Sequence, residues 1–204
     1  MTAIIILNWN GAADTVKCLQ SLVKADGEFV VYVVDNGSSD DSVVRIQSWI
    51  DEHDTMDVRL VSLDKNYGFA KGNNMGLKIA RELAPDNYLL LNNDTEVTPD
   101  FLVRLQEFSA RYPKYRVLTP KINYHHDKHK VWNCGGRLFF GFRKYFYAGY
   151  TDFDIKEKDF LTYVMKIFID IEDRCVSDIF THLRSPYTAG LYLIDFYYSI
   201  PNRT

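Results

Sequence analysis

Short apolar runs and helical repeats alternate along the first 125 residues. Continuous apolar or β-branched runs predict strands that are covered on both faces, and they span residues 3–7, 29–34, 58–63 and 88–91. Apolar residues at helical spacing predict helices between these strands, over residues 14–23, 43–50, 75–83 and about 98–112. This alternation predicts an α/β fold, with a Rossmann-like, mostly parallel sheet and helices on both faces.

The pattern weakens after residue 125. Aromatic residues and glycines over 131–150 predict short antiparallel strands and turns, and residues 151–204 show no clean period. The apolar segment 191–200 predicts a buried or partner-facing strand, with contact to a membrane surface as the alternative. If exposed, this segment would favour a homo-oligomer. We therefore expect a ligand-binding α/β domain over 1–125 and a second, divergent or truncated region over 126–204.

Composition narrows the partners and the cellular setting. The net charge of −3 gives no basic surface that would suggest nucleic acid as a partner. Three cysteines without CxxC spacing argue against structural disulfides or a zinc site, so we expect a reducing, cytoplasmic setting. The first residues lack the early positive charge and long apolar core of a signal peptide, and no apolar run approaches eighteen residues. Peripheral attachment at the inner face of the membrane is the alternative setting.

Polar residues gather where the second predicted strand ends. Asp35 follows the apolar run and opens the turn-rich cluster 35–40. Ligands of open parallel sheets bind outside the carboxyl ends of the strands, so Asp35 is a candidate to accept hydrogen bonds from a base or a ribose. That role predicts weaker nucleotide binding in Asp35→Ala, with thermal stability nearly unchanged. The alternative is that Asp35 only forms a turn.

A loop rich in glycine and asparagine spans residues 66–74. Gly68 and Gly72 allow a close approach of the backbone, and the loop leads into a helix N-terminus whose N–H groups suit phosphate. Lys71 adds a positive charge. Neither the P-loop pattern nor GxGxxG is present, which argues against a dinucleotide cofactor. The alternative is an ordinary glycine-containing turn.

The fourth predicted strand ends in Asn92-Asn93-Asp94. Carboxylate and amide oxygens are hard ligands, and they suit a divalent Mg²⁺ or Mn²⁺ ion that bridges diphosphate oxygens. The alternative is an Asx turn that joins the strand to the next helix.

In this order, the three clusters and the opening segment 4–11 resemble family 2 glycosyltransferases of the GT-A fold, and most closely a rhamnosyltransferase-like group. The resemblance covers about residues 1–150. It implies an inverting transferase that takes a sugar from a dTDP- or UDP-linked donor to a saccharide or lipid-linked acceptor, in cell-surface polysaccharide or glycan synthesis. It makes 1–125 the nucleotide-sugar domain and 126–204 the acceptor side. It places Asp94 on the metal and implies nucleotide contacts from Asn8, Asn10, Asp35, Asn66, Gly68, Lys71, Asn73 and Asn93.

The catalytic base is the point where the chain departs from the family pattern. The family takes its base from a Glu-Asp pair behind a Thr-Gly strand, and Glu172-Asp173 has that composition. However, the segment before this pair is short and lacks Thr-Gly, so a solvated acidic turn is the alternative. A second function therefore stays open, in which the chain binds nucleotide sugar without turnover because its acceptor half is defective.

The first loop and a group of histidines suggest two other classes of site. A nucleotidyltransferase would need a glycine-rich, basic first loop, which Asn8-Trp9-Asn10-Gly11 lacks.

Three histidines lie close together in a charged loop and predict a solvated segment, with a metal site as the alternative; they are His125, His126 and His129.

Overall fold

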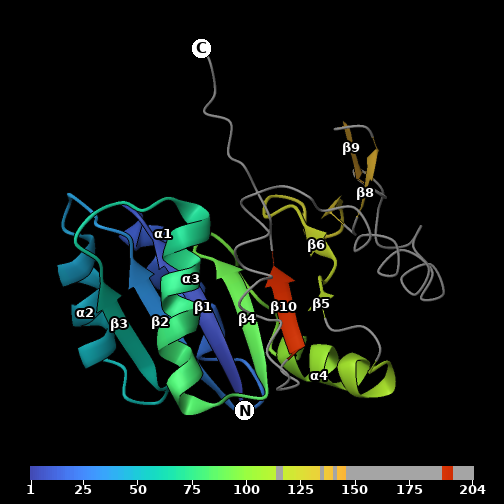
Figure 1. Cartoon of the computed structure of the whole chain (residues 1–204), viewed down its shortest axis with the longest axis horizontal. Coiled ribbons are helices and arrows are strands. Elements are labelled where there is room, and N and C mark those ends of the chain that lie inside the picture. The colour runs from blue at the N-terminus through green and yellow to red at the C-terminus, as the bar shows by residue number, and fades with distance from the viewer. Residues whose placement is uncertain (114–116, 134–135, 140–141, 146–189, 195–204) are drawn as a thin grey trace.

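The computed structural model describes residues 1–113, 117–133, 136–139, 142–145 and 190–194. Six parallel strands form one sheet in the order β3-β2-β1-β4-β10-β5 (Figure 1). Their bounds are β1 Thr2–Asn8, β2 Phe29–Asp35, β3 Val58–Ser62, β4 Asn87–Asn92, β5 Val117–Leu118 and β10 Gly190–Ile194. The helices are α1 Ala12–Leu22, α2 Ser42–Asp51, α3 Phe69–Ala80 and α4 Phe101–Arg111, with a 3₁₀ turn, η1, at Arg81–Leu83.

Helices cover both faces of the sheet, as predicted. Alternate strand residues point to opposite faces. One face packs against α1, α2 and α4 through a core that includes Ile4, Ile6, Val31, Val33, Leu89, Leu91, Leu19, Ile46 and Leu102. The other face packs against α3 through Ile5, Val30, Val34, Leu90, Leu77 and Ala80. The strands are apolar throughout because both of their faces are buried.

The strand order reverses at β1. The chain moves from β1 to β2 to β3 in one direction and then crosses to β4 on the other side of β1. Since parallel crossovers are right-handed, this reversal places α3 on the face opposite α1 and α2. The carboxyl ends of β1 and β4 lie beside each other at this reversal, and ligands of open α/β sheets bind at such a point.

Helix α3 begins earlier than the sequence pattern predicted. It starts at Phe69, so residues 69–74 of the predicted loop 66–74 are helical. Its glycines lie against the sheet: a Cβ on Gly72 would come within 2.7 Å of the Leu7 side chain, and a Cβ on Gly76 within 2.7 Å of Ile5. Glycine weakens a helix by itself, but here it permits close packing of α3 on β1.

The later part of the chain returns to the sheet. β10 pairs with β4 and β5, so this part of the predicted apolar segment 191–200 is a strand. Within the predicted segment 131–150, β8 Gly136–Phe139 pairs antiparallel with β9 Phe142–Tyr145. β7 Val131–Asn133 pairs antiparallel with β6 Ile122–Asn123, which precedes that segment. The division at residue 125 and the homo-oligomer stay predictions. Among the described helices, none is both long and apolar enough to cross a membrane.

Candidate functional site

Four loops meet at the carboxyl edge of the sheet, and a buried network of hydrogen bonds joins them. Asn8, the last residue of β1, is fully buried. Its amide Nδ2 donates to Asp35 Oδ1 at 2.7 Å, and its Oδ1 accepts from the hydroxyl of Thr15 at 2.8 Å. Asn8 therefore links the end of β2 to the first turn of α1.

Asp35 lies inside this network and is only 1% exposed. Besides Asn8, its carboxylate accepts from the Ser38 backbone N–H at 2.9 Å and from the Ser38 hydroxyl at 2.6 Å. A carboxylate with this burial and these partners holds the loop after β2 in place. The expectation that Asp35→Ala leaves thermal stability nearly unchanged does not fit this environment. Contact of Asp35 with a nucleotide stays a prediction.

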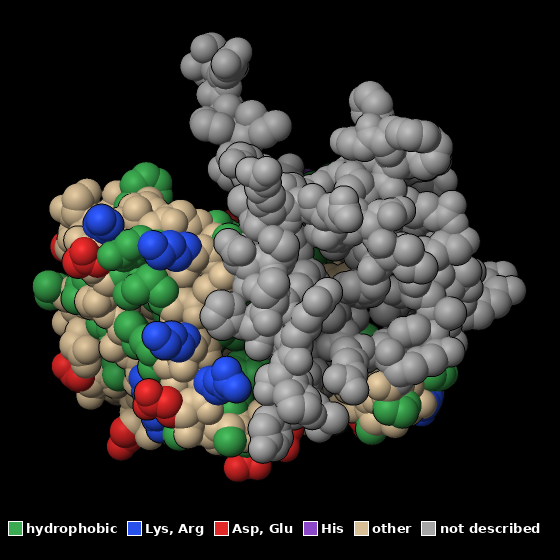
Figure 2. All heavy atoms as spheres, in the orientation of Figure 1, with side chains coloured by type: hydrophobic (Ala, Val, Ile, Leu, Met, Phe, Trp, Pro, Cys, Tyr) green, Lys and Arg blue, Asp and Glu red, His purple; other side chains and the backbone are tan. Residues whose placement is uncertain are grey.

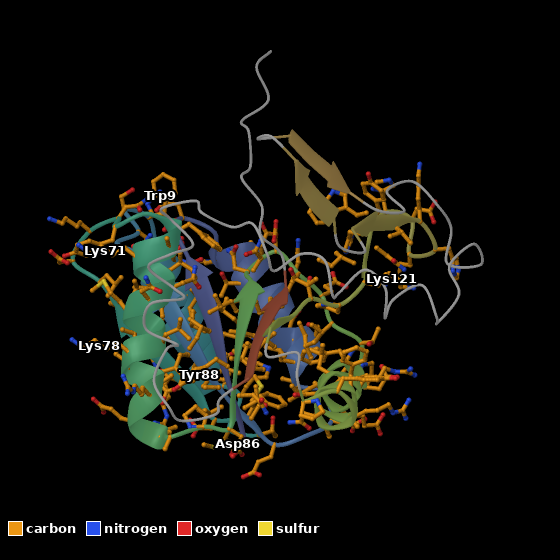
Figure 3. All side chains as sticks on the ribbon, turned by 45° about the vertical axis from the view of Figure 1, so that its right-hand side comes forward. Trp9, Lys71, Lys78, Asp86, Tyr88 and Lys121 are labelled. Atoms are coloured by element: carbon orange, nitrogen blue, oxygen red, sulfur yellow. The ribbon has the colours of Figure 1, made fainter. Side chains whose placement is uncertain are left out.

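The loop after β1 is exposed and is tied to the loop after β2. Asn10 takes a left-handed conformation with φ 51°, which asparagine tolerates better than most residues. Its backbone N–H donates to Ser38 Oγ at 2.8 Å, and its Oδ1 accepts from the Ser39 N–H at 2.9 Å. Beside it, Trp9 is 56% exposed at the same edge as Lys71 (Figure 3). In the sequence, Trp9 appeared only as part of the opening segment Asn8-Trp9-Asn10-Gly11 and had no predicted role.

A second set of contacts joins the β2 loop to the α3 loop. Asn36 is buried, and its Nδ2 donates to Asn66 Oδ1 at 3.0 Å while its Oδ1 accepts from the Tyr67 N–H at 2.9 Å. Gly37 has φ 69°, and a Cβ there would lie 2.3 Å from the Lys65 backbone. Only glycine permits this approach of the two loops.

The N-terminus of α3 opens at the same edge. Asn66 Oδ1 accepts from the Gly68 N–H at 2.7 Å, and Gly68, with φ 80°, is the N-cap residue before the helix. Lys71 is exposed, with its Nζ 4.4 Å from the centre of the Tyr67 ring. In contrast, Asn73 is buried and its Nδ2 donates to the Phe69 carbonyl at 2.9 Å.

Basic side chains gather over the face that carries α3 (Figure 2). Lys71 and Lys78 both project outward from this helix (Figure 3). Seven residues separate them, which is about 10 Å along a helix, so only Lys71 stands in the first turn at the carboxyl edge. This arrangement suits Lys71 for a phosphate at the helix N-terminus, a site that backbone N–H groups and the helix dipole favour.

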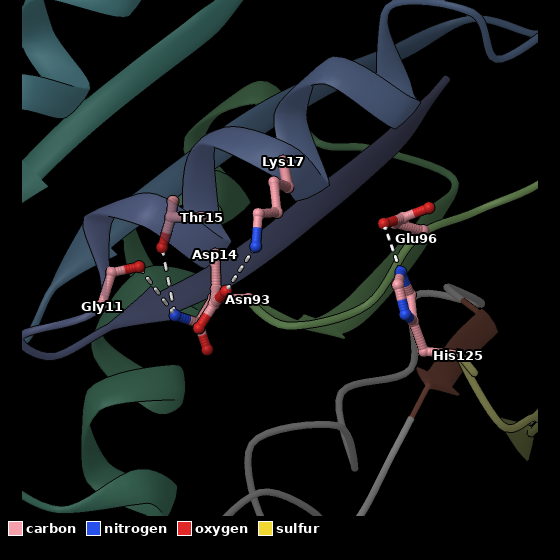
Figure 4. Close-up of polar contacts among 7 residues, drawn as sticks. All are labelled: Gly11, Asp14, Thr15, Lys17, Asn93, Glu96 and His125. Atoms are coloured by element: carbon pink, nitrogen blue, oxygen red, sulfur yellow. Dashed lines mark hydrogen bonds and ion pairs between the residues drawn. The ribbon is translucent and has the colours of Figure 1, made fainter.

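The turn after β4 brings Asn93 and Asp94 to the site. Asn93 Nδ2 donates to Thr15 Oγ1 at 3.1 Å and approaches the Gly11 carbonyl at 3.5 Å (Figure 4). A Cβ on Gly11 would lie 2.9 Å from this nitrogen, so glycine makes room for the amide. Asp94 is exposed and follows directly.

The side chains of Asn93 and Asp94 suit a cation that also binds the oxygens of a phosphate ligand. Within the described part of the chain, no three His, Cys, Asp or Glu side chains gather closely enough to hold a metal ion alone. Mg²⁺ in phosphate-binding sites takes one or two carboxylates and completes its shell with water and phosphate oxygens. The exposed Asp94 carboxylate beside the Asn93 amide fits that requirement. The nearby Glu96 carboxylate instead pairs with His125 Nε2 at 2.8 Å (Figure 4).

The carboxylates of Asp94 and Glu96 also affect the pKa of a thiol in helix α1. Burial raises the pKa of the Cys18 thiol from 9.0 to about 12, and the charges of Asp94 and Glu96 add to the increase. Cys18 therefore stays a neutral thiol packed under the turn, with its Sγ 3.8 Å from the Asn92 carbonyl.

The structure brings most of the predicted nucleotide residues to one edge. Asn10, Asn66, Gly68 and Lys71 are exposed there, as is the predicted metal ligand Asp94. Asn93 is half-buried, and Asn8, Asp35 and Asn73 are buried. The predicted catalytic residues Glu172 and Asp173 lie outside the described residues.

Comparison with known sequences agrees with this geometry. The sequence model described as "Glycosyl transferase family 2" matches residues 3–167. The chain is 32% identical, over 121 residues, to the low-salt glycan biosynthesis hexosyltransferase Agl10 of Haloferax volcanii. This match covers 59% of the chain and 36% of Agl10, so the chain spans about a third of the length of this relative.

Solved structures share the fold. S. aureus TarS matches with a TM-score of 0.52 at 21% identity, over 61% of this chain and 22% of that one. TarS 1–349 in complex with UDP-GlcNAc matches with a TM-score of 0.50 at 20% identity, over 62% and 36%. The mannosyltransferase PcManGT of Pyrobaculum calidifontis, in complex with GDP-Man and Mn²⁺, matches with a TM-score of 0.51 at 20% identity, over 62% and 36%. These likenesses confirm the predicted α/β sheet with its flanking helices.

Proposed function

The chain belongs to glycosyl transferase family 2 and has the GT-A fold, and on that premise we propose that it binds a nucleoside diphosphate sugar at the carboxyl edge of its sheet. Its reaction would move the sugar to a hydroxyl acceptor by metal-assisted inverting displacement, in cell-surface polysaccharide or glycan synthesis. A cytoplasmic setting, peripheral to the inner face of the membrane, belongs to the same proposal.

One observation carries the proposal: the loops after β1, β2 and β4 and the start of α3 converge at the point where the strand order reverses. Hydrogen bonds of the buried side chains of Asn8, Asp35 and Asn36 hold these loops together. The residues left exposed around this framework have the chemistry that a nucleoside diphosphate needs. They offer an aromatic face, amide groups, a lysine and a carboxylate.

The nucleoside would lie over the loops after β1 and β2. The exposed indole of Trp9 offers a surface for stacking a base, and the amides of Asn10 and Asn66 offer hydrogen bonds. The diphosphate would then extend toward the N-terminus of α3, where Lys71 adds a positive charge. The rhamnosyltransferase-like subgroup and a dTDP- or UDP-linked donor remain part of this proposal.

Departure of the diphosphate requires charge neutralisation. Asp94 would hold Mg²⁺ or Mn²⁺, with the Asn93 amide beside it, and a bound divalent cation supplies charge stabilisation to the leaving group. Lys71 would act on the same charge from the first turn of α3. A Mn²⁺-bound mannosyltransferase among the solved structures of this fold supports a metal in the proposal.

Transfer requires a base on the acceptor side. In the proposed displacement, a carboxylate takes the proton of the acceptor hydroxyl while that oxygen attacks the anomeric carbon. Glu172 and Asp173 are our candidates for this role. The acceptor, a saccharide or a lipid-linked sugar, is part of the same proposal.

Titration calorimetry tests the donor half. The chain is titrated with UDP, dTDP and GDP, each with and without Mn²⁺. We expect UDP or dTDP to bind more tightly than GDP, and Mn²⁺ to tighten that binding. Absence of binding by all three nucleotides contradicts the proposal. Slow hydrolysis of the matching nucleotide sugar then separates a transferase from a module that only binds, because the module releases no free sugar.

A further inference from the structure

A directed series of hydrogen bonds runs from Asn93 inward to Asp35, and it passes through Thr15. A carboxylate accepts hydrogen bonds, so the Asn8 amide turns its NH₂ toward Asp35, at 2.7 Å, and its carbonyl toward Thr15. The Thr15 hydroxyl gives its single proton to Asn8 Oδ1, at 2.8 Å. Its lone pairs are then left to accept from Asn93 Nδ2, at 3.1 Å.

This order of donors and acceptors determines which way the Asn93 amide faces. The NH₂ group points inward, to Thr15 and to the space that Gly11 leaves by lacking a Cβ (Figure 4). The carbonyl oxygen of the same amide is therefore turned away from Thr15. If the hydroxyl were absent, the NH₂ would keep only the longer contact with the Gly11 carbonyl, at 3.5 Å.

We propose that Thr15 is a positioning residue that orients the turn Asn93–Asp94, and with it the oxygen ligands offered to the metal and the diphosphate. This inference rests on the proposed function. Thr15 is 0% exposed, so it cannot contact a ligand and acts through Asn93. Through Asn8 it also sets this turn relative to the loop after β2. The half of the site that binds the nucleoside and the half that binds the metal are thus connected by one hydroxyl group.

The test measures the factor by which Mn²⁺ tightens UDP or dTDP binding, at a temperature well below the thermal midpoint of every variant. Thr15→Val keeps the shape of the side chain and removes the hydroxyl, whereas Thr15→Ser restores the hydroxyl. Thr2→Val is the matched control, because Thr2 is equally buried at the opposite end of β1 and accepts from Gln106 Nε2 at 3.2 Å. Loss of a group that orients a metal ligand costs about 10- to 100-fold in metal affinity.

We expect this factor to fall by about tenfold or more in Thr15→Val and to stay near the parent value in Thr15→Ser and Thr2→Val. In an Asn93→Ala background, which removes the other partner of the same bond, Thr15→Val should cause no further fall. If Thr15→Val does not fold, Asn93→Ala alone must show the same fall, and a factor unchanged there overturns the inference.

Two further outcomes separate this inference from the function on which it rests. An unchanged factor in Thr15→Val, with a lowered thermal midpoint, shows a purely structural role and overturns the inference alone. Equal losses from Thr15→Val with and without Asn93 do the same, because Thr15 would then not act through that amide. A parent chain that binds no nucleotide overturns the proposed function and the inference together.

Discussion

Replacement of Asp35 by alanine should destabilise the protein as well as weaken its binding of nucleotide. The carboxylate is 1% exposed and accepts three hydrogen bonds, from Asn8 Nδ2 and from the backbone N–H and hydroxyl of Ser38. In Asp35→Ala, the Asn8 amide keeps a contact with Ser38 Oγ at 3.2 Å, but the Ser38 N–H and the Ser38 hydroxyl both lose their acceptor.

The magnitude follows from these contacts. A buried donor that is left without a partner costs about 1–3 kcal/mol. Three donors are affected here: the Ser38 N–H fully, and the Asn8 amide and the Ser38 hydroxyl in part, because the amide keeps a second contact and the hydroxyl can rotate. We therefore expect a loss of about 2–4 kcal/mol in the free energy of unfolding. For a chain of this size, each kcal/mol shifts the thermal midpoint by roughly 2–4 °C, so the midpoint should fall by about 5–15 °C.

Thermal unfolding followed by circular dichroism measures the effect. Asp14→Ala is the control, because Asp14 is 55% exposed and only pairs with Lys17 at 3.4 Å on the surface of α1. Such a pair contributes about 0–1 kcal/mol. A midpoint for Asp35→Ala within about 2 °C of the parent would correspond to a loss of roughly 1 kcal/mol or less. In that case the carboxylate does not hold the loops and our reasoning is refuted.

Three further predictions test the edge of the site. Lys71→Ala should weaken UDP or dTDP binding about tenfold, as expected for one charge-assisted phosphate contact, whereas Lys78→Ala, on the same helix but farther from the edge, should leave the calorimetric Kd unchanged. Asp94→Asn should abolish the difference between titrations with and without Mn²⁺, and a surviving difference would place the metal elsewhere. Burial raises the pKa of Cys18 from 9.0 to about 12, so this thiol should resist a disulfide reagent at pH 8 until the protein unfolds, measured with the other two cysteines replaced by serine. Since the folded pKa is the higher one, stability linked to Cys18 should be present below about pH 9 and be lost as the pH rises toward 12.

The chain pattern was enough to predict the fold because the relevant signals are local. Apolar runs such as Ile4–Ile6 are short and are flanked by turn residues, which predicts strands with two covered faces. Asp35 follows such a run directly, and Asp94 follows one after two asparagines. The order of these clusters also carried the resemblance to family 2 glycosyltransferases, which the comparisons confirm. The start of α3 was predicted too late, since Gly72 and Gly76 weaken a helix when they are read without the sheet that they pack against.

Other properties depend on partners that are distant in sequence, and only the tertiary structure decided them. In the sequence, Asp35, Asn8 and Asn93 are polar residues at strand ends. Nothing there distinguishes a side chain that contacts the bound nucleotide from one that holds the loops in place. Their contacts join residues 27 and 78 positions apart, Asn8 with Asp35 and Thr15 with Asn93, so no local pattern encodes them. Burial in the folded protein makes this distinction. Buried, hydrogen-bonded side chains such as Asn8 and Asp35 hold the loops, because their polar groups are already paired inside the protein. The exposed side chains of Lys71 and Asp94 are left free to face a ligand.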